Sequence, residues 1–371
     1  MTVTWSNQQI KEFRKTLLDW YDEERRDLPW RQDHDPYHVW ISEIMLQQTQ
    51  VNTVIPYYTR FMKLFPTVSD LANADEAVLL KAWEGLGYYS RAKNLKRAAQ
   101  QIMADYQGVF PETPEALEDL AGIGPYTAGA IASIAFNVPV PAVDGNAFRV
   151  FSRLMEIEAD IAKPQTRKIF TDIIAKVIDP DRPGDFNQAI MDLGSSYMTA
   201  KNPDPEHSPV KAFDQAYLDG KELDFPVKSK KPKPVDVPYV GLIIRSERGY
   251  LMQHRGTTGM LAGFWTFPLI KIADLDLGDD VVMATELAQH VTEYLHRETG
   301  ITAELTPMGG RAITQVYTHQ KWQVNLFGAE VLAQDLSHFP GEWVPQSNLA
   351  KLALPKVQIK MMNRLGMDPT K

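Results

Sequence analysis

The segment Leu120-Ala-Gly-Ile-Gly-Pro-Tyr-Thr127 lies between two helical patterns and is the best guide to the fold of the first half of the chain. Its glycines, Gly122 and Gly124, permit positive φ angles and let the main chain come close to a ligand. A helix that starts at or near Pro125 would point free amides and a partial positive charge outward, which suits a phosphate. We therefore predict a phosphate-binding hairpin between two helices, with an ordinary interhelical turn as the alternative.

Around this hairpin, the first half of the chain has the pattern of many short helices. From Gln8 to about Leu223, apolar residues recur at spacings of three and four, and predicted helices begin after Pro36, Asp75, Thr113, Tyr126 and Asp144. Beyond a Pro/Lys-rich segment, β-rich stretches at 240–244, 250–253 and 322–331 surround one helix at about 283–297. We predict a multidomain chain, with an all-α helix-hairpin-helix domain (1–226), a basic linker (227–236) and an α+β domain (237–371).

The composition limits the class of protein. The chain has 371 residues, of which 44% are hydrophobic and 23% charged, as in globular proteins. Its start lacks a signal sequence, and no apolar run approaches the roughly 20 residues that a bilayer requires, so we expect a monomeric cytoplasmic protein without membrane contact. It contains no cysteine, which excludes disulfides, thiol catalysis and cysteine-ligated zinc or iron–sulfur sites.

The net charge of −8 does not favour nucleic-acid binding through the overall field, because neutralisation of phosphates supplies most non-specific affinity. Residues 1–227 alone hold 23 Lys and Arg against 33 Asp and Glu. DNA binding would have to use local groups, and backbone amides and two basic clusters are the candidates. The clusters are Arg91, Lys93, Lys96 and Arg97, for which a solvated helix face is the alternative, and Lys228, Lys230, Lys231 and Lys233.

Two acidic residues stand out in the helical half. Glu43 lies in an apolar helix beside Trp40, Ile44 and Leu46, where burial should raise its pKa and keep it protonated. Asp144 stands at a helix start, where backbone amides favour the ionised form. A structural glutamate and a simple N-cap are the alternatives. One neutral acid with one carboxylate is the pair that breaks a glycosidic bond through an oxocarbenium-like transition state.

Further runs accompany the hairpin: Leu28-Pro-Trp-Arg31, Ser42-Glu-Ile-Met-Leu-Gln-Gln-Thr-Gln-Val51, Gly85-Leu-Gly-Tyr-Tyr-Ser-Arg91 and Val143-Asp-Gly-Asn146. Together these runs resemble the MutY family of adenine DNA glycosylases, and the resemblance extends from about Leu28 to the C-terminus. It implies an enzyme of base excision repair that flips out an adenine mispaired with 8-oxoguanine, or with guanine, in double-stranded DNA. The enzyme then hydrolyses the N-glycosidic bond.

The resemblance also assigns roles to the catalytic residues. Glu43 would protonate N7 of adenine and later activate water, while Asp144 would stabilise the sugar cation or form a transient covalent adduct. Tyr126 and Asn146 would assist. In bifunctional relatives that resemble endonuclease III, the position of Tyr126 is a lysine that forms a Schiff base, which a phenol cannot do. We therefore expect base removal without strand cleavage; a glycosylase-lyase is the alternative.

Three further sets of residues follow from the resemblance. Gln48 and Tyr88 would enter the base stack beside the orphaned guanine, with Thr49 and Leu86 nearby; core packing is the alternative for Tyr88. Gly122 and Gly124 of the hairpin would contact DNA, and a monovalent cation at its carbonyls is left open. The expected adenine pocket consists of Arg26, Trp30, Arg31, Leu46, Val51 and Gln188.

The segment 195–220 departs from the family pattern. The family carries four cysteines that bind a [4Fe–4S] cluster there, and this chain has Met198, Pro205, Ser208 and Asp214 at those places. We expect a cluster-free remnant held by apolar contacts of Val210, Phe213, Tyr217 and Leu218. A degenerate, non-catalytic lesion-binding protein is one alternative, and a different metal held by His207 with Asp204 and Glu206 is another. We predict no metal and no cofactor.

The second domain contains Gly263-Phe-Trp-Thr-Phe-Pro268 and His296-Arg-Glu-Thr-Gly300, which resemble a Nudix fold. The catalytic Nudix box needs several carboxylates for magnesium, and here the aligned residues are Glu293, Tyr294, Arg297 and Glu298. The resemblance implies a non-hydrolytic reader of 8-oxoguanine. The family's Phe-Ser-His loop is Tyr317-Thr-His319 here, so Thr318 and His319 are the expected lesion contacts, and the extra methyl bears on the preference for 8-oxoguanine over guanine.

Overall fold

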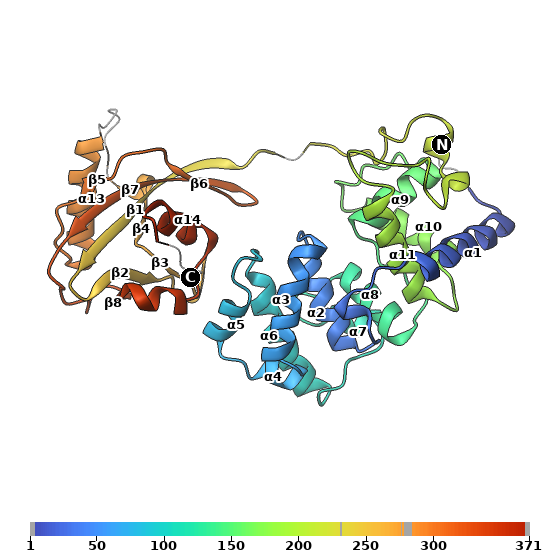
Figure 1. The fold of residues 1–371 in the computed structure, drawn as a ribbon, viewed down its shortest axis with the longest axis horizontal. Coiled ribbons are helices and arrows are strands. Elements are labelled where there is room, and N and C mark those ends of the chain that lie inside the picture. Colours follow the sequence, from blue (N-terminus) through green and yellow to red (C-terminus); the bar gives the residue numbers. More distant parts are fainter. Residues whose placement is uncertain (1–3, 231, 276, 278–283, 368–371) are drawn as a thin grey trace. The chain divides into compact units, whose positions relative to one another are not determined.

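The computed structural model describes residues 4–230, 232–275, 277 and 284–367, and Figure 1 shows its helices and strands. The chain forms two compact units, the first of Met1–Asn73 with Asn94–Lys231 and the second of Ala74–Lys93 with Pro232–Lys371. The division at 231 and 232 falls at positions of the expected linker, of which Lys231 lies outside the described residues. None of the helices in the described ranges is long and apolar enough to cross a membrane.

Residues 74–93 belong to the second unit, although the sequence placed them in the first domain. The segment contains helix α5 (Glu76–Ala82) and the turn after it. The backbone N–H of Leu354 donates to Oε1 of Glu84 (3.0 Å), and Nζ of Lys81 donates to the carbonyl of Leu352 (3.0 Å). The spacing of apolar residues along a helix does not indicate such long-range hydrogen bonds. For this reason the sequence predicted a continuous first domain.

The described part of the first unit consists of short helices and loops. Several helices begin where predicted because the side chains of Asp35, Thr113 and Asp144 accept hydrogen bonds from amides of the first turn. The helices are α1 (Asn7–Glu24), η1 (Pro29–Arg31), α2 (Pro36–Leu46), α3 (Val51–Leu64), α4 (Val68–Ala72), α6 (Ser90–Asp105, which begins in the second unit), α7 (Pro114–Glu118), α8 (Pro125–Phe136), α9 (Gly145–Met155), α10 (Thr166–Val177), α11 (Pro183–Ser196), η2 (Lys211–Phe213) and α12 (Gln215–Leu218).

A core of aromatic side chains joins α1, α9, α10 and α11. Phe13, Phe151, Phe170 and Phe186 are fully buried in it. The ring centroid of Phe13 lies 6.5 Å from that of Phe151 and 6.2 Å from that of Phe186, both edge to face. This core holds α9, which begins at the N-cap Asp144, and α11, which contributes Gln188 to the cavity described below.

The segment 195–220 joins the same core by apolar contact. Val210 is fully buried, and the ring of Phe213 packs edge to face against that of Phe13 (centroids 5.4 Å apart). The expected roles of Tyr217 and Leu218 are wrong. Leu218 is 59% exposed, and the phenol of Tyr217 bonds to Glu206 at the surface, because the one-turn helix α12 turns these side chains outward.

Buried polar groups complete this segment. Arg153, which is 1% exposed, donates from Nε to the carbonyl of Glu222 (2.9 Å) and from Nη1 to that of Thr199 (3.0 Å). Asp214, at a cysteine position of the family, caps α12 through the amide of Tyr217 (3.2 Å). Hydrogen bonds and packing therefore hold this segment against the rest of the first unit.

Phe13→Ala is expected to destabilise the first unit by about 3–5 kcal/mol, because it empties the centre of the aromatic core. Urea unfolding followed by tryptophan fluorescence measures this loss. Leu64→Ala, at a 48% exposed position of α3, is the matched control and should change stability by less than about 0.5 kcal/mol. Equal effects of the two substitutions would contradict this account of the core.

The second unit is built on a mixed sheet around β1 (Val235–Ser246). β1 pairs in parallel with β7 (Gln320–Glu330) and antiparallel with β2 (Gly249–His254) and β4 (Leu269–Lys271), so the predicted strands at 240–244, 250–253 and 322–331 are confirmed. The other elements are β3 (Trp265–Thr266), η3 (Ile272–Asp274), β5 (Thr306–Pro307), β6 (Ile313–Val316), β8 (Gly341–Val344) and η4 (Gln346–Lys351), with helices α13 (Ala284–Thr299) and α14 (Lys356–Arg364).

The two helices cover opposite faces of this sheet because side chains alternate along β1. Val240 and Leu242 share a buried cluster with Val291 of α13. Gly241, between them, faces α14, where a Cβ would lie 3.0 Å from Sδ of Met361. The helix that the sequence placed at about 283–297 is α13, and Met283 itself lies outside the described residues.

Candidate active site

Glu43 is buried in the middle of α2, where its side chain meets groups from three other elements. It is 5% exposed, and the hydroxyl of Tyr126, in the first turn of α8, donates a hydrogen bond to its Oε2. Burial raises the pKa of Glu43 to about 7, as predicted. The bond from Tyr126 lowers this pKa, the charge of Asp144 raises it and that of Arg31 lowers it. Glu43 can therefore hold a proton near neutral pH.

Asp144 caps α9 as predicted, but its electrostatics differ from the expectation. Its Oδ1 accepts from the amide of Ala147 (2.7 Å), and its Oδ2 accepts from Nδ2 of Asn146 (2.7 Å). Burial raises the pKa of Asp144, and these hydrogen bonds offset only part of that effect. Still, Asp144 acts on Glu43 as a negative charge. The ionised form of Asp144 therefore favours the protonated form of Glu43.

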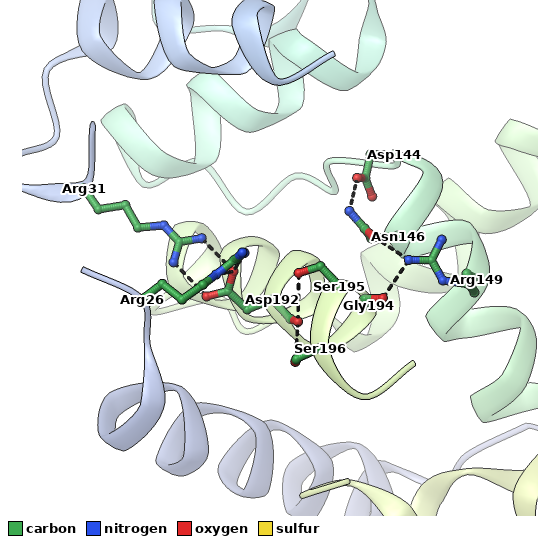
Figure 2. A network of polar contacts seen from close by, with 9 residues as sticks. All are labelled: Arg26, Arg31, Asp144, Asn146, Arg149, Asp192, Gly194, Ser195 and Ser196. Atoms are coloured by element: carbon green, nitrogen blue, oxygen red, sulfur yellow. Dashed lines mark hydrogen bonds and ion pairs between the residues drawn. The ribbon is translucent and has the colours of Figure 1, made fainter. Parts of the chain in front are cut away.

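Arg149 fixes the amide of Asn146, as Figure 2 shows. Its Nη2 donates to Oδ1 of Asn146 (2.6 Å) and to the carbonyl of Gly194 (2.7 Å), and its Nε donates to the carbonyl of Met198 (2.6 Å). With its oxygen held by a cation, the amide must turn its nitrogen toward Asp144. Arg149 was not among the predicted site residues, although its position three residues after Asn146 on a helix could have indicated the contact.

A cavity of about 1240 Å³ brings most of the predicted site together within the first unit. Trp30, in its wall, is 6% exposed and packs edge to face on Tyr58 (centroids 5.4 Å apart). Gln188 reaches the cavity from α11. The predicted residues that line it are Arg26, Trp30, Arg31, Glu43, Leu46, Gln48, Thr49, Val51, Tyr126, Asp144, Asn146 and Gln188.

Two cations in this wall share the buried carboxylate of Asp192, which was not among the predicted site residues. Both oxygens of Asp192 accept hydrogen bonds from Arg31 (2.7 and 3.0 Å), and Oδ1 also accepts from Nε of Arg26 (2.9 Å). Burial alone would raise the pKa of Asp192, but the bonds from the two arginines hold it below its usual range. The position four residues after Gln188 on one helix is a signal that could have found Asp192.

The hairpin at 120–127 has the geometry that the sequence predicts. Gly122 has a φ of 78°, and a Cβ there would lie 2.6 Å from that of Asn94, so only glycine fits. Gly124 is the N-cap of α8, and a Cβ there would meet nothing within 4 Å. The start of this twelve-residue helix is thus open to a ligand, as a phosphate contact requires.

The residues expected at the base stack lie on strained turns. Gln48 (φ 60°) and Tyr88 (φ 47°) adopt the left-handed conformation, which side chains other than glycine rarely take. Tyr88 is 49% exposed, in contrast to the core alternative. Leu86 is only 6% exposed, so its side chain packs inside the unit, and its place near the base stack stays a prediction.

Thr318 and His319 form the tip of the β6–β7 hairpin in the second unit, and both are exposed. The amide of Tyr317 closes the turn on the carbonyl of Gln320 (2.7 Å). Burial raises the pKa of Tyr317, and so does the nearby phenol of Tyr89, next to Tyr88 in the same unit. The hairpin and the Tyr88 turn therefore approach each other.

The basic cluster at 91–97 is only partly available. Arg91 donates to the carbonyls of Leu86 and Gly87 (both 3.0 Å), and burial lowers its pKa to about 10. Lys93 pairs with Glu76 (2.8 Å). Arg91 thus shapes the Tyr88 turn, which corrects its expected role as a phosphate ligand. Lys96 and Arg97 remain candidates.

No group of three or more potential metal ligands occurs among the residues that the structure describes. His207 pairs with Asp204 (2.8 Å), while Glu206 binds Lys211 (3.0 Å) instead of joining them. On α13, Glu298 pairs with Arg297 (2.8 Å). Neither place assembles the carboxylates that a magnesium site needs.

Tyr126→Phe is expected to extend activity toward higher pH and to lower its maximum. The hydroxyl lowers the pKa of Glu43, so its loss leaves Glu43 protonated at pH values where the parent has lost its proton. The pH dependence of the single-turnover rate of the reaction at this site measures this extension of the active pH range. Tyr57→Phe, on α3, is the control and should keep the parent profile; a Tyr126→Phe profile that moves to lower pH would contradict the assignment.

Family models match both halves of the chain. Residues 41–176 match the HhH-GPD superfamily of base excision DNA repair proteins, and residues 239–364 match the NUDIX domain. A thermostable thymine-DNA glycosylase of known structure is 27% identical, with a TM-score of 0.51 over 57% of this chain and 98% of that one. An endonuclease III–DNA complex (19% identical, TM-score 0.50) shares the fold over 59% of this chain and all of that one. The fold and the site define a helix-hairpin-helix DNA glycosylase joined to a Nudix domain.

Relatives narrow this class. The adenine DNA glycosylase of Rattus norvegicus is 37% identical over 77% of this chain and 68% of its own length. That of Buchnera aphidicola (subsp. Baizongia pistaciae) is 36% identical over 69% of this chain and 73% of its own. The Arabidopsis thaliana enzyme is 39% identical over 72% of this chain, which spans about half of it (48%). The chain belongs to the adenine DNA glycosylase family.

Proposed function

We propose that this chain is a monofunctional glycosylase that excises adenine paired with 8-oxoguanine or guanine in duplex DNA. The observation that carries the proposal is Glu43, a buried acid with a pKa of about 7 that receives a hydrogen bond from Tyr126 and shares a cavity with Asp144. An acid that is half protonated near neutral pH suits proton donation to a leaving base. Family membership supports adenine as that base.

In this mechanism, Glu43 gives its proton to N7 of the flipped adenine while the bond from N9 to C1′ of the sugar breaks. The bonding electrons leave with the base, and the sugar becomes an oxocarbenium ion. The carboxylate of Asp144, oriented by Asn146, stabilises that positive charge. Water then adds to C1′ and returns its proton to Glu43, which restores the enzyme and leaves an abasic site.

Strand cleavage by a Schiff base needs an amine at the sugar. Position 126 carries a phenol, and no lysine lines the cavity in the described ranges. The basic groups that line it are guanidinium groups: Arg26, Arg31, Arg149 and Arg167. An arginine stays protonated in proteins and makes no Schiff base, so the reaction stops at the abasic site.

Recognition of the opposite base belongs to the second unit in this proposal. The exposed Tyr88 supplies a stacking face, and the hydroxyl of Thr318 supplies a hydrogen-bond donor and acceptor. The phenol of Tyr89 raises the pKa of Tyr317, which supports a short distance between the turn that carries Tyr88 and the hairpin that carries Thr318. We propose that this surface reads 8-oxoguanine, and that the chain acts as a cytoplasmic monomer on mispaired DNA.

The test is a single-turnover assay on a duplex with one adenine opposite 8-oxoguanine, with and without hot alkali. Strand scission only after alkali supports a monofunctional glycosylase. Scission without alkali would show a lyase nucleophile. Folded protein that binds this duplex but produces no abasic site would replace the proposal with a non-catalytic lesion-binding protein.

Iron chelation is expected to leave both the rate of adenine release and the melting temperature of the protein unchanged. The chain has no cysteine, so an iron–sulfur cluster cannot form, and we propose that the reaction needs no other metal. Rates and melting curves after dialysis against EDTA and an iron chelator check this. A loss of rate that a divalent metal restores would contradict the proposal.

A further inference from the structure

We propose that Asp192 is a positioning residue of the active site, which aims Arg26 and Arg31 at the cavity and cancels their charge beside Glu43. The inference rests on the proposed function, because it assigns a role in the same acid-catalysed reaction. Asp192 thereby sets the upper limit of the pH range in which Glu43 keeps its proton.

The geometry makes Asp192 the anchor of both guanidinium groups. Asp192 is 4% exposed, and it accepts from Nη1 of Arg31 (2.7 Å), from Nη2 of Arg31 (3.0 Å) and from Nε of Arg26 (2.9 Å). Figure 2 shows the two arginines converging on this carboxylate. A planar carboxylate that accepts paired bonds fixes the plane of a guanidinium as well as its position.

The backbone under Asp192 is held as well. The hydroxyls of Ser195 and Ser196 donate to the carbonyl of Asp192 (3.1 and 2.7 Å), in the last turn of α11. Gln188, one turn earlier, lines the cavity on the same side of the helix. Leu193, fully buried, ties this part of α11 to the aromatic core. The carboxylate is thus placed by a rigid element.

The charges around Glu43 explain why the neutralisation of Arg31 by Asp192 affects the proton on Glu43. Tyr126 faces it from α8, Asp144 from the start of α9 and Arg31 from η1. Arg31, with a side chain 12% exposed, has its charge in surroundings where water screens little. An unpaired Arg31 would lower the pKa of Glu43 further, and Glu43 would then lose the proton that it must donate. Two further groups contact the guanidinium of Arg31. Asp192 accepts its hydrogen bonds, and the ring centroid of Tyr21 lies 5.8 Å from its Cζ atom.

The experiment is the pH dependence of single-turnover adenine release for the parent, Asp192→Asn and Asp185→Asn. Asp185 is a matched control because it lies on the same helix as Asp192 and pairs with an arginine (Arg182 Nε, 2.8 Å) that does not line the cavity. We expect the midpoint of the alkaline decline to fall by about one pH unit in Asp192→Asn. At pH values above the midpoint, the rate of adenine release should then be about tenfold lower than in the parent, and acidification should restore it. Asp185→Asn should keep the parent midpoint.

Arg31→Gln keeps the inference testable if Asp192→Asn does not fold. It removes the cation itself, so the midpoint should move to higher pH, while the double variant Asp192→Asn/Arg31→Gln should return toward the parent. Asp192→Glu, which restores the charge, should recover most of the shift. A midpoint that stays at the parent value in Asp192→Asn or Arg31→Gln, with a rate reduced equally at every pH, would overturn the inference and leave a merely structural ion pair.

The two proposals fail in different ways. If the parent releases no adenine at any pH, the proposed function fails before the variants are compared. If the parent is active and its midpoint does not depend on the charge at Asp192 or Arg31, only the role of Asp192 fails.

Discussion

Glu43→Gln is expected to lower the single-turnover rate of adenine release by about 10³ to 10⁴-fold at pH 7. The amide matches the carboxyl in size but has no proton to give, so the base would have to leave as an anion. Burial makes this group irreplaceable, because at 5% exposure water cannot easily take over as the acid. The measurement is quenched single-turnover kinetics with alkali development of abasic sites.

The substitution should spare the fold and DNA binding. A buried carboxyl with a pKa of about 7 is already half neutral at pH 7, so a neutral amide in its place costs little stability. Melting temperature and affinity for the 8-oxoguanine duplex are the controls. A folded Glu43→Gln that keeps its rate within about tenfold of the parent would remove Glu43 from the mechanism.

Asp144→Asn is expected to lower the same rate by about 10² to 10³-fold, because it removes the negative charge that faces the developing sugar cation. A second effect adds to the first. The charge of Asp144 raises the pKa of Glu43, so its loss lowers that pKa, and the rate should decline at lower pH than in the parent. A complete pH profile separates the two effects.

Stability should not fall with activity in this variant. Burial raises the folded-state pKa of Asp144, so ionisation opposes folding as pH rises through its unfolded and folded pKa values. Asparagine caps helices as well as aspartate does, and a neutral amide removes this penalty above that window. Asp75→Asn, at the exposed N-cap of α5, is the matched control. A parent-like rate in Asp144→Asn would contradict its role at the sugar.

Local chemistry explains which predictions the structure confirmed. Asp144 caps its helix with an amide three residues away, and Gly122 of the 120–127 hairpin adopts a positive φ that its lack of a side chain permits. Glu43 is buried because its immediate neighbours in α2 are apolar. Each of these outcomes depends on contacts within about one helical turn, which a sequence pattern contains.

The remaining features depend on how distant segments meet. Asp192 and Arg31 are 161 positions apart, Leu354 and Glu84 are 270 apart, and neither pair leaves a periodic signal. The exposure of Leu218 and the burial of Leu86 follow from the path of short turns, not from residue type.

Residue type and local spacing are thus enough to predict the helical and β-rich halves, the acid pair and the absence of an iron–sulfur cluster. The packing of distant segments is what makes burial outweigh the helix cap in the pKa of Asp144 and brings Arg26 and Arg31 to one carboxylate. Burial and charge pairing are sums over neighbours from the whole chain, and the fold alone chooses those neighbours.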